Sequence, residues 1–203
     1  MIIKIDVDGV IRNMFDNMCE VYCNWFGDYL TVNDIFDYDV DKVFPKVRLN
    51  LGISAAEFFF RMHTKEVFLL SKPYYGVKEA IERLMMHGHK VVIATWQYTF
   101  ENKINTLHFF EVNDIPYDDI CFTKDKWMIK ADWIIDDTPE FIIDERETAH
   151  KIMINMPYNK DIKYDCFREN SLNDAVETIL KYENEISYDK NKIILNKKTY
   201  DTD

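Results

Sequence analysis

The chain of 203 residues opens with Met1-Ile-Ile-Lys-Ile-Asp-Val-Asp-Gly-Val10, an apolar run that leads into two carboxylates. Such a run is typical of a short buried strand, and the glycine that follows favours a sharp turn. The same pattern returns at Trp133-Ile-Ile135, which leads directly into Asp136 and Asp137. Between them, Lys90-Val-Val-Ile-Ala94 is a third apolar run, of the kind expected for a strand that is buried on both faces.

Helical patterns alternate with these strands. The segment from Val77 to His87 is amphipathic, and Gly88 follows it where a helix favours a left-handed residue. We expect further helices around residues 100–112, 141–148 and 172–182, and short strands around 120–122 and 151–155. Strands that alternate with helices imply right-handed crossovers and a parallel sheet. The sequence therefore predicts the α/β class, with a Rossmann-like parallel sheet flanked by helices.

Residues 13–71 interrupt the alternation, because only helical spacing is found there. Apolar residues recur every three or four positions from Met14 to Phe26, and Ser54 followed by Glu57 indicates the start of another helix that continues to Val67. We therefore expect a small α-helical cap inserted after the first strand. The predicted organisation is a core of residues 1–12 and 72–186, a cap of residues 13–71, and a tail of residues 187–203 that is either a docked strand or a loose segment.

The composition disfavours several classes of protein. Lys and Arg number 25 against 36 Asp and Glu, a net charge of −11, whereas a protein that tracks a nucleic-acid backbone needs clustered basic residues. No apolar run approaches the roughly 18 residues of a membrane span, and the N-terminus lacks the pattern of a signal peptide. We expect a cytoplasmic protein with no nucleic-acid or membrane partner. A small phosphorylated substrate stays compatible with this charge, since one or two local cations and a metal can hold it.

Polar side chains follow three of the predicted strands, and the carboxyl ends of parallel strands meet at one edge, where ligands bind. Carboxylates gathered there repel one another unless a cation lies among them. Mg²⁺ suits such a site, because it prefers hard oxygen ligands and keeps positions open for a phosphate. A lysine and a hydroxyl could then hold phosphoryl oxygens. The candidates are Asp6, Asp8, Thr95, Lys126, Asp136 and Asp137.

Asp6 and Asp8 lie two residues apart at the end of a strand, so their side chains share one side of the chain. One carboxylate can therefore attack phosphorus while the other reaches the leaving oxygen. Simpler interpretations stay open at this point. Each aspartate could be a turn former, Thr95 could cap the next helix, and Lys124 is a local alternative to Lys126.

Four motifs in this order resemble those of the haloacid dehalogenase superfamily of phosphohydrolases. They are Ile5-Asp-Val-Asp-Gly-Val10, Val92-Ile-Ala-Thr95, Lys126 and Ile134-Ile-Asp-Asp137. Within that superfamily the chain is most similar to the 5′(3′)-deoxyribonucleotidase family. The features that carry this similarity are the ten-residue step from Lys126 to Asp136, Asp137-Thr-Pro-Glu140, Met156-Pro-Tyr-Asn159 and the helical insertion.

The resemblance implies that Asp6 is the nucleophile that forms an aspartyl-phosphate, and that Asp8 is the general acid and then the general base. It also implies that Thr95 and Lys126 bind the phosphoryl group. Mg²⁺ would be held by Asp6, the backbone carbonyl of Asp8, and Asp137, with Asp136 as an outer partner or alternative ligand. Trp96 departs from the family pattern, which often has a small residue after the threonine, and this leaves the shape of the pocket open.

The predicted function is that of a Mg²⁺-dependent phosphomonoesterase acting on (deoxy)nucleoside 5′-monophosphates. The same chemistry on another small phosphoester, such as a sugar phosphate, is the alternative enzyme, and a binding protein on the same fold is the non-catalytic one. In the cap, aromatic residues could stack a nucleobase or form a core, and basic residues could attract an anion or face solvent. These residues are Phe15, Trp25, Phe58, Phe59 and Phe60, and Lys42, Lys46, Arg48, Arg61 and Lys65. The tail from Ser187 could cross to the second subunit of a homodimer.

Overall fold

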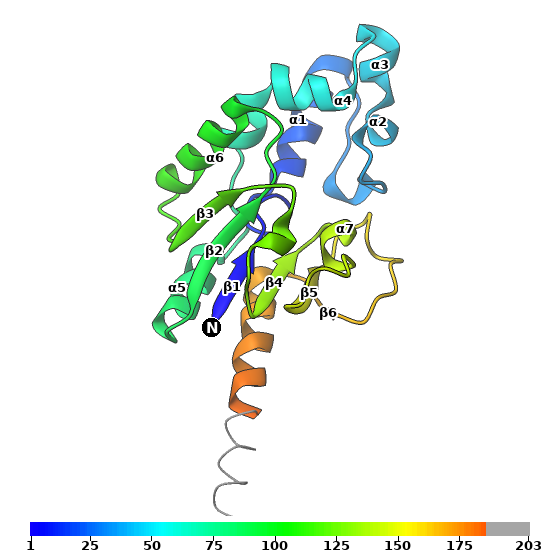
Figure 1. Ribbon diagram of the computed structural model, residues 1–203. Helices are drawn as coiled ribbons and strands as arrows, with labels where there is room; N and C mark the ends of the chain where they lie inside the picture. Colours follow the sequence, from blue (N-terminus) through cyan, green and yellow to red (C-terminus); the bar gives the residue numbers. More distant parts are fainter. Residues whose placement is uncertain (186–203) are drawn as a thin grey trace, which may run out of the picture.

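A computed structural model describes residues 1–185 of the chain. Within these residues six strands form one sheet in the order β3-β2-β1-β4-β5-β6, and every neighbouring pair is parallel (Figure 1). The predicted α/β class with a Rossmann-like parallel sheet is thus confirmed. The strands are β1 (Ile2–Ile5), β2 (Lys90–Thr95), β3 (Asp119–Phe122), β4 (Trp133–Asp136), β5 (His150–Ile154) and β6 (Phe167–Glu169).

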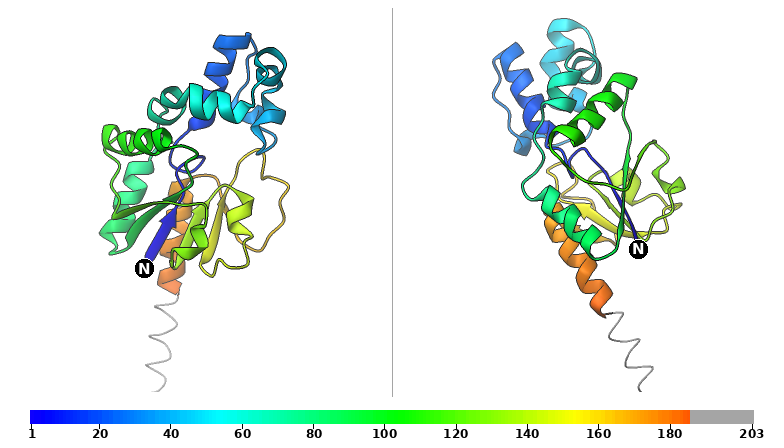
Figure 2. Two further views of the ribbon diagram at one scale, coloured as in Figure 1. Left: turned by 45° about the horizontal axis from the view of Figure 1, so that its top comes forward. Right: turned by 90° about the vertical axis from the view of Figure 1, so that its left-hand side faces the viewer.

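Helices cover both faces of this sheet. On one face, α5 (Val77–Met86) and the helix of residues 172–185 lie side by side, joined by an ion pair of 2.7 Å between Arg83 and Glu177 (Figures 1 and 2). They bury apolar side chains in one core with β1, β2 and the end of α6 (Phe100–Val112). The single turn α7 (Pro139–Ile142) packs against Ile134 of β4. The next residue of the strand, Ile135, belongs instead to the core that β1, β2 and α5 share. Successive side chains of a strand point to opposite faces, so α7 covers the second face.

The segment after β4 differs from the sequence prediction. A helix was expected around residues 141–148, but the structure has only α7 there. Two side chains explain the difference. The carboxylate of Asp144 accepts the backbone N–H of Arg146 at 2.9 Å, which favours a turn, and Glu147 extends inward to the Nζ atom of Lys4 at 2.5 Å.

Residues 13–71 form helices and turns with no strand among them, as the spacing predicted. Their apolar side chains, including Phe44, Phe58 and Val67, make a core of their own. In Figure 1 they gather beyond the carboxyl ends of the strands. The elements are α1 (Met14–Phe26), η1 (Val32–Asp34), α2 (Val40–Val43), α3 (Pro45–Leu51), α4 (Ala55–Glu57) and the π-helical turns η2 (Phe58–Met62) and η3 (Lys65–Leu69).

The chain passes between the sheet and these helices at two adjacent points. The backbone N–H of Asn13 donates to the carbonyl of Lys72, and that of Tyr74 donates to the carbonyl of Ile11, each at 2.9 Å. The helical segment therefore leaves and re-enters the sheet at one place, next to the turn that carries Asp8. No helix within residues 1–185 has the length and apolar character needed to cross a bilayer. The predicted tail from Ser187 lies outside the described residues.

Candidate active site

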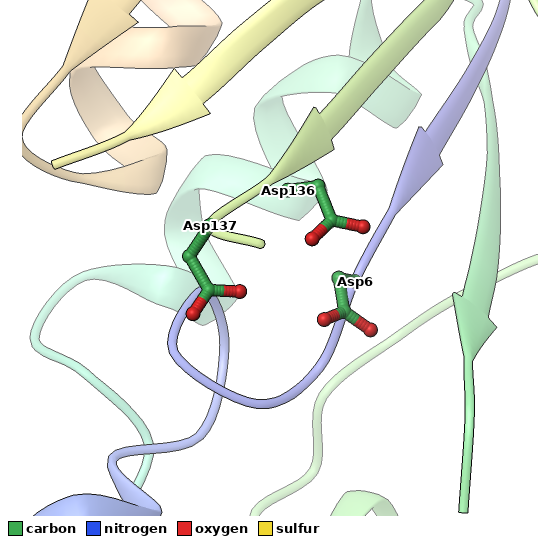
Figure 3. Close-up of side chains that lie close together, drawn as sticks. All are labelled: Asp6, Asp136 and Asp137. Atoms are coloured by element: carbon green, nitrogen blue, oxygen red, sulfur yellow. The ribbon is translucent and has the colours of Figure 1, made fainter. Parts of the chain in front are cut away.

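Three carboxylates meet at the carboxyl ends of β1 and β4. Asp6 directly follows β1, Asp136 ends β4 and Asp137 comes next, and oxygens of all three lie within 4.8 Å of one another (Figure 3). The strand register brings them together, since Ile5 pairs with Ile135 and the N–H of Asp6 donates to the carbonyl of Ile135 at 3.0 Å. All three side chains are buried.

A buried lysine neutralises part of this charge. Lys126 begins the turn η4 (Lys126–Met128), and its Nζ atom lies 2.9 Å from Oδ1 of Asp6 and 2.6 Å from Oδ2 of Asp136. The other oxygen of Asp136 accepts the N–H of Thr138 at 2.9 Å, so Asp136 chiefly holds the lysine. Lys124 is exposed instead, and its ammonium lies 3.8 Å from Glu140. The structure thus places Lys126, and not Lys124, at the carboxylates.

Lys4, a residue of β1 with no exposed surface, forms hydrogen bonds to the backbone of the loop that carries Lys126. The Nζ atom of Lys4 donates to the carbonyls of Lys126 and Ile129 at 2.8 and 3.0 Å, and to Glu147 at 2.5 Å. A charged residue in the central strand is rare in a buried sheet, and here it fixes the backbone beneath the candidate phosphate ligand.

Burial changes the protonation of the cluster. It raises the pKa of Asp6 to about 7, an effect that the Lys126 ammonium opposes and the carboxylates of Asp136 and Asp8 strengthen. Burial, followed by the charges of Asp136 and Asp6, raises the pKa of Asp137 well above its ordinary value. Burial alone would lower the pKa of Lys126, but Asp136 and Asp6 outweigh it and the pKa is raised. If all three carboxylates are ionised, their charge exceeds that of the single Lys126 ammonium, and their mutual repulsion adds to the effect of burial on the pKa values of Asp6 and Asp137.

These carboxylates have the donor set of a divalent-cation site. Among the described residues, Oδ1 of Asp137 is buried and has no hydrogen-bond partner. Hard carboxylate oxygens are the ligands that Mg²⁺ prefers, and a cation would relieve the repulsion described above. The residues present therefore fit such an ion.

Asp8 lies apart from the three clustered carboxylates and has partners of its own. Its Oδ1 atom accepts a hydrogen bond from Nε of Arg12 at 2.7 Å, and its Oδ2 atom accepts one from Nε2 of Gln97 at 2.9 Å. The same Gln97 nitrogen lies 3.1 Å from Oγ1 of Thr95, at the end of β2. One amide thus joins the two candidate residues Asp8 and Thr95.

A cavity of about 170 Å³ opens at this edge of the sheet. Five of the six candidate residues line it, whereas Asp136 lies behind them: the five are Asp6, Asp8, Thr95, Lys126 and Asp137. The remaining wall is mostly aromatic, with Phe15, Tyr38, Phe60 and Phe68 from the helical segment and Trp96, Tyr98 and Phe141 from the sheet side. The site therefore has a charged floor and an apolar wall.

The structure divides the aromatic residues that could have stacked a base. Phe15 and Phe60 line the cavity, whereas Phe58 and Phe59 have no exposed surface and belong to the core of the helical segment. Trp25 is 50% exposed and meets the Phe58 ring edge-on at 5.4 Å. Trp96, the departure from the family pattern, lies on the cavity wall.

Three of the five basic residues in the helical segment are paired with nearby carboxylates. Lys42 pairs with Asp37, Lys46 with Asp28 and Arg48 with Asp41, at 2.6, 2.6 and 3.1 Å. Arg61 lies over the Tyr98 ring at 5.3 Å. In each ion pair the carboxylate neutralises the charge of the basic side chain. This favours the interpretation that these basic residues face solvent over the one in which they attract an anionic substrate.

Four further residues near the site had no role assigned to them from the sequence, although two of them, Tyr158 and Asn159, belong to the Met156–Asn159 motif. The hydroxyl of Tyr158 donates to Asp137, and Nδ2 of the fully buried Asn159 donates to the Asp137 carbonyl at 2.7 Å. Gln97 and Arg12 are the other two. Residues 9–11, between Asp8 and Arg12, form a turn, and Gln97 lies beyond the end of β2, so neither helical nor strand spacing marks these two residues in the sequence.

Comparison with models of known protein families matches residues 1–184 to the family described as 5′ nucleotidase, deoxy (pyrimidine), cytosolic type C protein. The chain belongs to this family. A protein of Chlorobaculum tepidum described as "Putative 5′(3′)-deoxyribonucleotidase" is 24% identical over 153 residues, which cover 69% of this chain and 71% of that protein. The family resemblance that the sequence motifs predicted is thereby confirmed, and the protein is a phosphoric monoester hydrolase of the 5′-nucleotidase type.

Solved structures show that this family member has the haloacid dehalogenase fold. L-2-haloacid dehalogenase from Xanthobacter autotrophicus superposes with a TM-score of 0.60 at 9% identity, covering 88% of this chain and 97% of that one. A "predicted phosphatase" from Clostridium acetobutylicum superposes with a TM-score of 0.57 at 16% identity, covering 89% and 98%. At such identities the likeness concerns the fold alone.

Proposed function

We propose that this member of the 5′-nucleotidase family is a Mg²⁺-dependent phosphomonoesterase that hydrolyses (deoxy)nucleoside 5′-monophosphates through an aspartyl-phosphate on Asp6. One observation carries the proposal. Asp6 lines a cavity together with Asp8, Thr95 and Lys126, and most of the other residues that line this cavity are aromatic. A charged floor suits a phosphate and an aromatic wall suits a base.

The residues divide the chemistry in two steps. A carboxylate oxygen of Asp6 attacks phosphorus, the bond from phosphorus to the ester oxygen breaks, and Asp8 gives its proton to that oxygen. Asp8 then takes a proton from a water that attacks the aspartyl-phosphate, so that phosphate leaves and Asp6 is regenerated. Thr95 and Lys126 bind the phosphoryl oxygens as their charge redistributes.

Asp6, Asp137 and the backbone carbonyl of Asp8 are the proposed Mg²⁺ ligands, with Asp136 as an outer partner. When bound, the cation supplies the positive charge that the carboxylates and an incoming phosphate lack. The buried, unpartnered Oδ1 of Asp137 supports this assignment. The ion pair with Asp136 positions the Lys126 ammonium, which can therefore bind phosphate while it keeps this ion pair.

A single nucleotide is the substrate class that the wall and the charge support best. Stacking of a base on an aromatic side chain is worth about 1–3 kcal/mol. A net charge of −11 opposes the approach of a polynucleotide. We propose that residues 13–71 act as a cap, because Phe15 and Phe60 close the cavity from that side.

A smaller phosphoester, such as a sugar phosphate, is the second candidate. The observation that favours it is the cavity volume of about 170 Å³. Pockets that enclose drug-sized ligands usually measure roughly 300–1,000 Å³. A nucleotide would then require the helical segment to move outward, whereas a small phosphoester would not.

The test is phosphate release from nucleoside monophosphates and sugar phosphates, each with Mg²⁺ and with EDTA. Asp6→Asn serves as the catalytic variant and Asp161→Asn, at an exposed aspartate away from the cavity, as the matched control. We expect Mg²⁺-dependent turnover of nucleotides that Asp6→Asn abolishes and Asp161→Asn retains. Turnover of sugar phosphates alone would move the assignment to the second candidate, and release of phosphate by Asp6→Asn at the wild-type rate would refute the mechanism.

A further inference from the structure

We propose that Arg12 and Gln97 are positioning residues, which together hold the Asp8 carboxylate where it can reach the leaving oxygen. The proposal rests on the function proposed above, because it concerns the acid–base residue of that reaction. Neither residue belongs to the motifs that indicated the site. What distinguishes both residues is their contact with the Asp8 carboxylate.

The Asp8 carboxylate is held at both of its oxygens. Its Oδ1 atom lies 2.7 Å from both Nε and Nη2 of Arg12, and its Oδ2 atom accepts the Gln97 hydrogen bond at 2.9 Å. Because the two donors approach different oxygens, rotation of the carboxylate would break at least one of these contacts. The side chain keeps 17% of its surface exposed, and it lines the cavity.

Arg12 is itself fixed from several sides. Its Nη1 atom donates to the carbonyl of Phe68 in η3 at 2.6 Å and to Oγ1 of Thr106 in α6 at 3.1 Å. Its guanidinium lies 4.9 Å from the centre of the Phe68 ring and 5.1 Å from that of Phe109. The residue has no exposed surface. A buried guanidinium is costly unless it is paired, and its carboxylate partner is Asp8.

Arg12 lies at the junction between the sheet and the helical segment and contacts residues of both. It stands where the chain leaves the sheet for the helical segment, and it forms a backbone bridge with Pro73, where the chain returns. One side chain therefore contacts η3, α6 and Asp8 at once. The orientation of the acid–base residue is tied by this contact to the seating of the helical segment on the sheet.

Gln97 supplies the second restraint from the sheet itself. It follows the end of β2, is 4% exposed, and directs Nε2 to both Asp8 and Thr95. The amide thus sets the spacing between the residue that would protonate the leaving oxygen and one that would bind the phosphoryl group. Catalysis depends steeply on such spacing, since a misplacement of about 1 Å can cost about 100-fold in rate.

A double-mutant cycle tests the proposal. Arg12→Met and Gln97→Met each remove the donor while keeping an unbranched side chain, and each is made in the wild type and in Asp8→Asn. We expect each single variant to lower kcat on a nucleoside monophosphate about tenfold, because the Asp8 carboxylate loses one of its two restraints, and to change KM less than kcat. In the Asp8→Asn background the same substitutions should change kcat less than about twofold. Arg12 and Gln97 act through the Asp8 carboxylate, so their removal has little further effect once that carboxylate is absent. An equal loss in both backgrounds would overturn the proposal.

Arg83→Met is the matched control, because Arg83 makes a surface ion pair with Glu177 away from the cavity. Thermal melting identifies any variant that fails to fold, and Gln97→Met keeps the test open if Arg12→Met is such a variant. A crystal structure of each variant gives a readout that needs no turnover. A displaced Asp8 carboxylate supports the positioning role even if no phosphoester is hydrolysed, in which case only the proposed function fails. An Asp8 carboxylate that stays in place in both variants refutes the positioning role whatever the activity.

Discussion

Gly9 and Asp137 approach each other so closely that a β-carbon on Gly9 would collide with Oδ2 of Asp137. Gly9 also has a φ angle of +82°, a region that L side chains rarely adopt. The turn after β1 can therefore close over Asp137 only because position 9 has no side chain. A glycine of the first motif and a carboxylate of the fourth are thus fitted to one another.

Gly9→Ala should consequently damage the site and the fold together. The left-handed backbone alone costs about 1–2 kcal/mol for a residue with a β-carbon. The collision displaces Asp137 in addition, so phosphate release should fall by about tenfold or more, as expected when a catalytic group moves by roughly 1 Å. Urea denaturation and an assay of phosphate release measure the two effects.

Gly27→Ala is the control for that experiment. Gly27 has a similar φ angle of +73° at the end of α1, but nothing lies within 4 Å of the β-carbon it would acquire. We expect the loss in stability without the loss in activity. Equal activity of the two variants would show that the approach of Gly9 to Asp137 is not needed.

The metal-free protein should become less stable as the pH rises towards neutrality. The pKa of Asp6 is about 7 in the folded protein against 3.8 for a free aspartate. Between these values the folded state keeps a proton that the unfolded state has released, so stability falls with rising pH by about 1 kcal/mol per unit. In EDTA, the free energy of unfolding of the wild type relative to Asp6→Asn should therefore be smaller at pH 7 than at pH 5. A constant difference would contradict the raised pKa, and Mg²⁺ should restore stability most at the higher pH.

Breaking the ion pair between Lys4 and Glu147 should be costly. Neither side chain has appreciable exposed surface, and removal of one partner of a buried pair typically costs about 3–5 kcal/mol. Glu147→Ala should lower the free energy of unfolding by about 3 kcal/mol, because the Lys4 charge stays buried without its partner. Lys4→Met combined with Glu147→Leu should recover part of this loss, and chemical denaturation of the three proteins measures it. A double variant less stable than Glu147→Ala would argue against this account.

Tyr158→Phe should weaken the response to Mg²⁺. The hydroxyl of Tyr158 donates to Asp137, which is one of the proposed Mg²⁺ ligands. Loss of a residue that hydrogen-bonds to a metal ligand typically lowers the affinity for the metal about 10- to 100-fold. The Mg²⁺ concentration that gives half-maximal phosphate release should therefore rise about tenfold. Tyr164→Phe is the control, because the Tyr164 hydroxyl meets only Lys151, at 3.2 Å, among the hydrogen bonds of the described residues. Identical Mg²⁺ responses of the two variants would refute a role for Tyr158.

The sheet could be predicted from the sequence because its strands are continuous apolar runs, and α6 begins and ends where its pattern does, at Phe100 and Val112. β6 was missed, since its three residues Phe167–Glu169 are mostly polar and lie at the sheet edge. The turn around Glu147 was missed because a partner 143 positions away, Lys4, decides its conformation. Local patterns carry no information about such a contact.

The residues of the candidate site likewise divide into those that local sequence patterns predict and those that only three-dimensional contacts reveal. Asp6, Asp136 and Asp137 could be placed together because strand ends in a parallel sheet share an edge. Arg12 and Gln97 could not be assigned from motifs, since their significance depends on which atoms surround Asp8. Residues that act at strand ends are therefore predictable from pattern, whereas residues that orient them depend on three-dimensional contacts.

The hydrogen bonds between Asn13 and Lys72 and between Ile11 and Tyr74 place the two ends of the helical segment next to each other. Insertions whose ends meet in this way disturb the host fold least. Evolution can thus lengthen, shorten or exchange the intervening residues while the sheet that carries the phosphate chemistry folds unchanged. Substrate selectivity, which depends on the helical segment, can then change at a different rate from reactivity, which depends on the sheet. A replaced helical segment must still fit the turn that carries Arg12, because Arg12 contacts both that segment and Asp8.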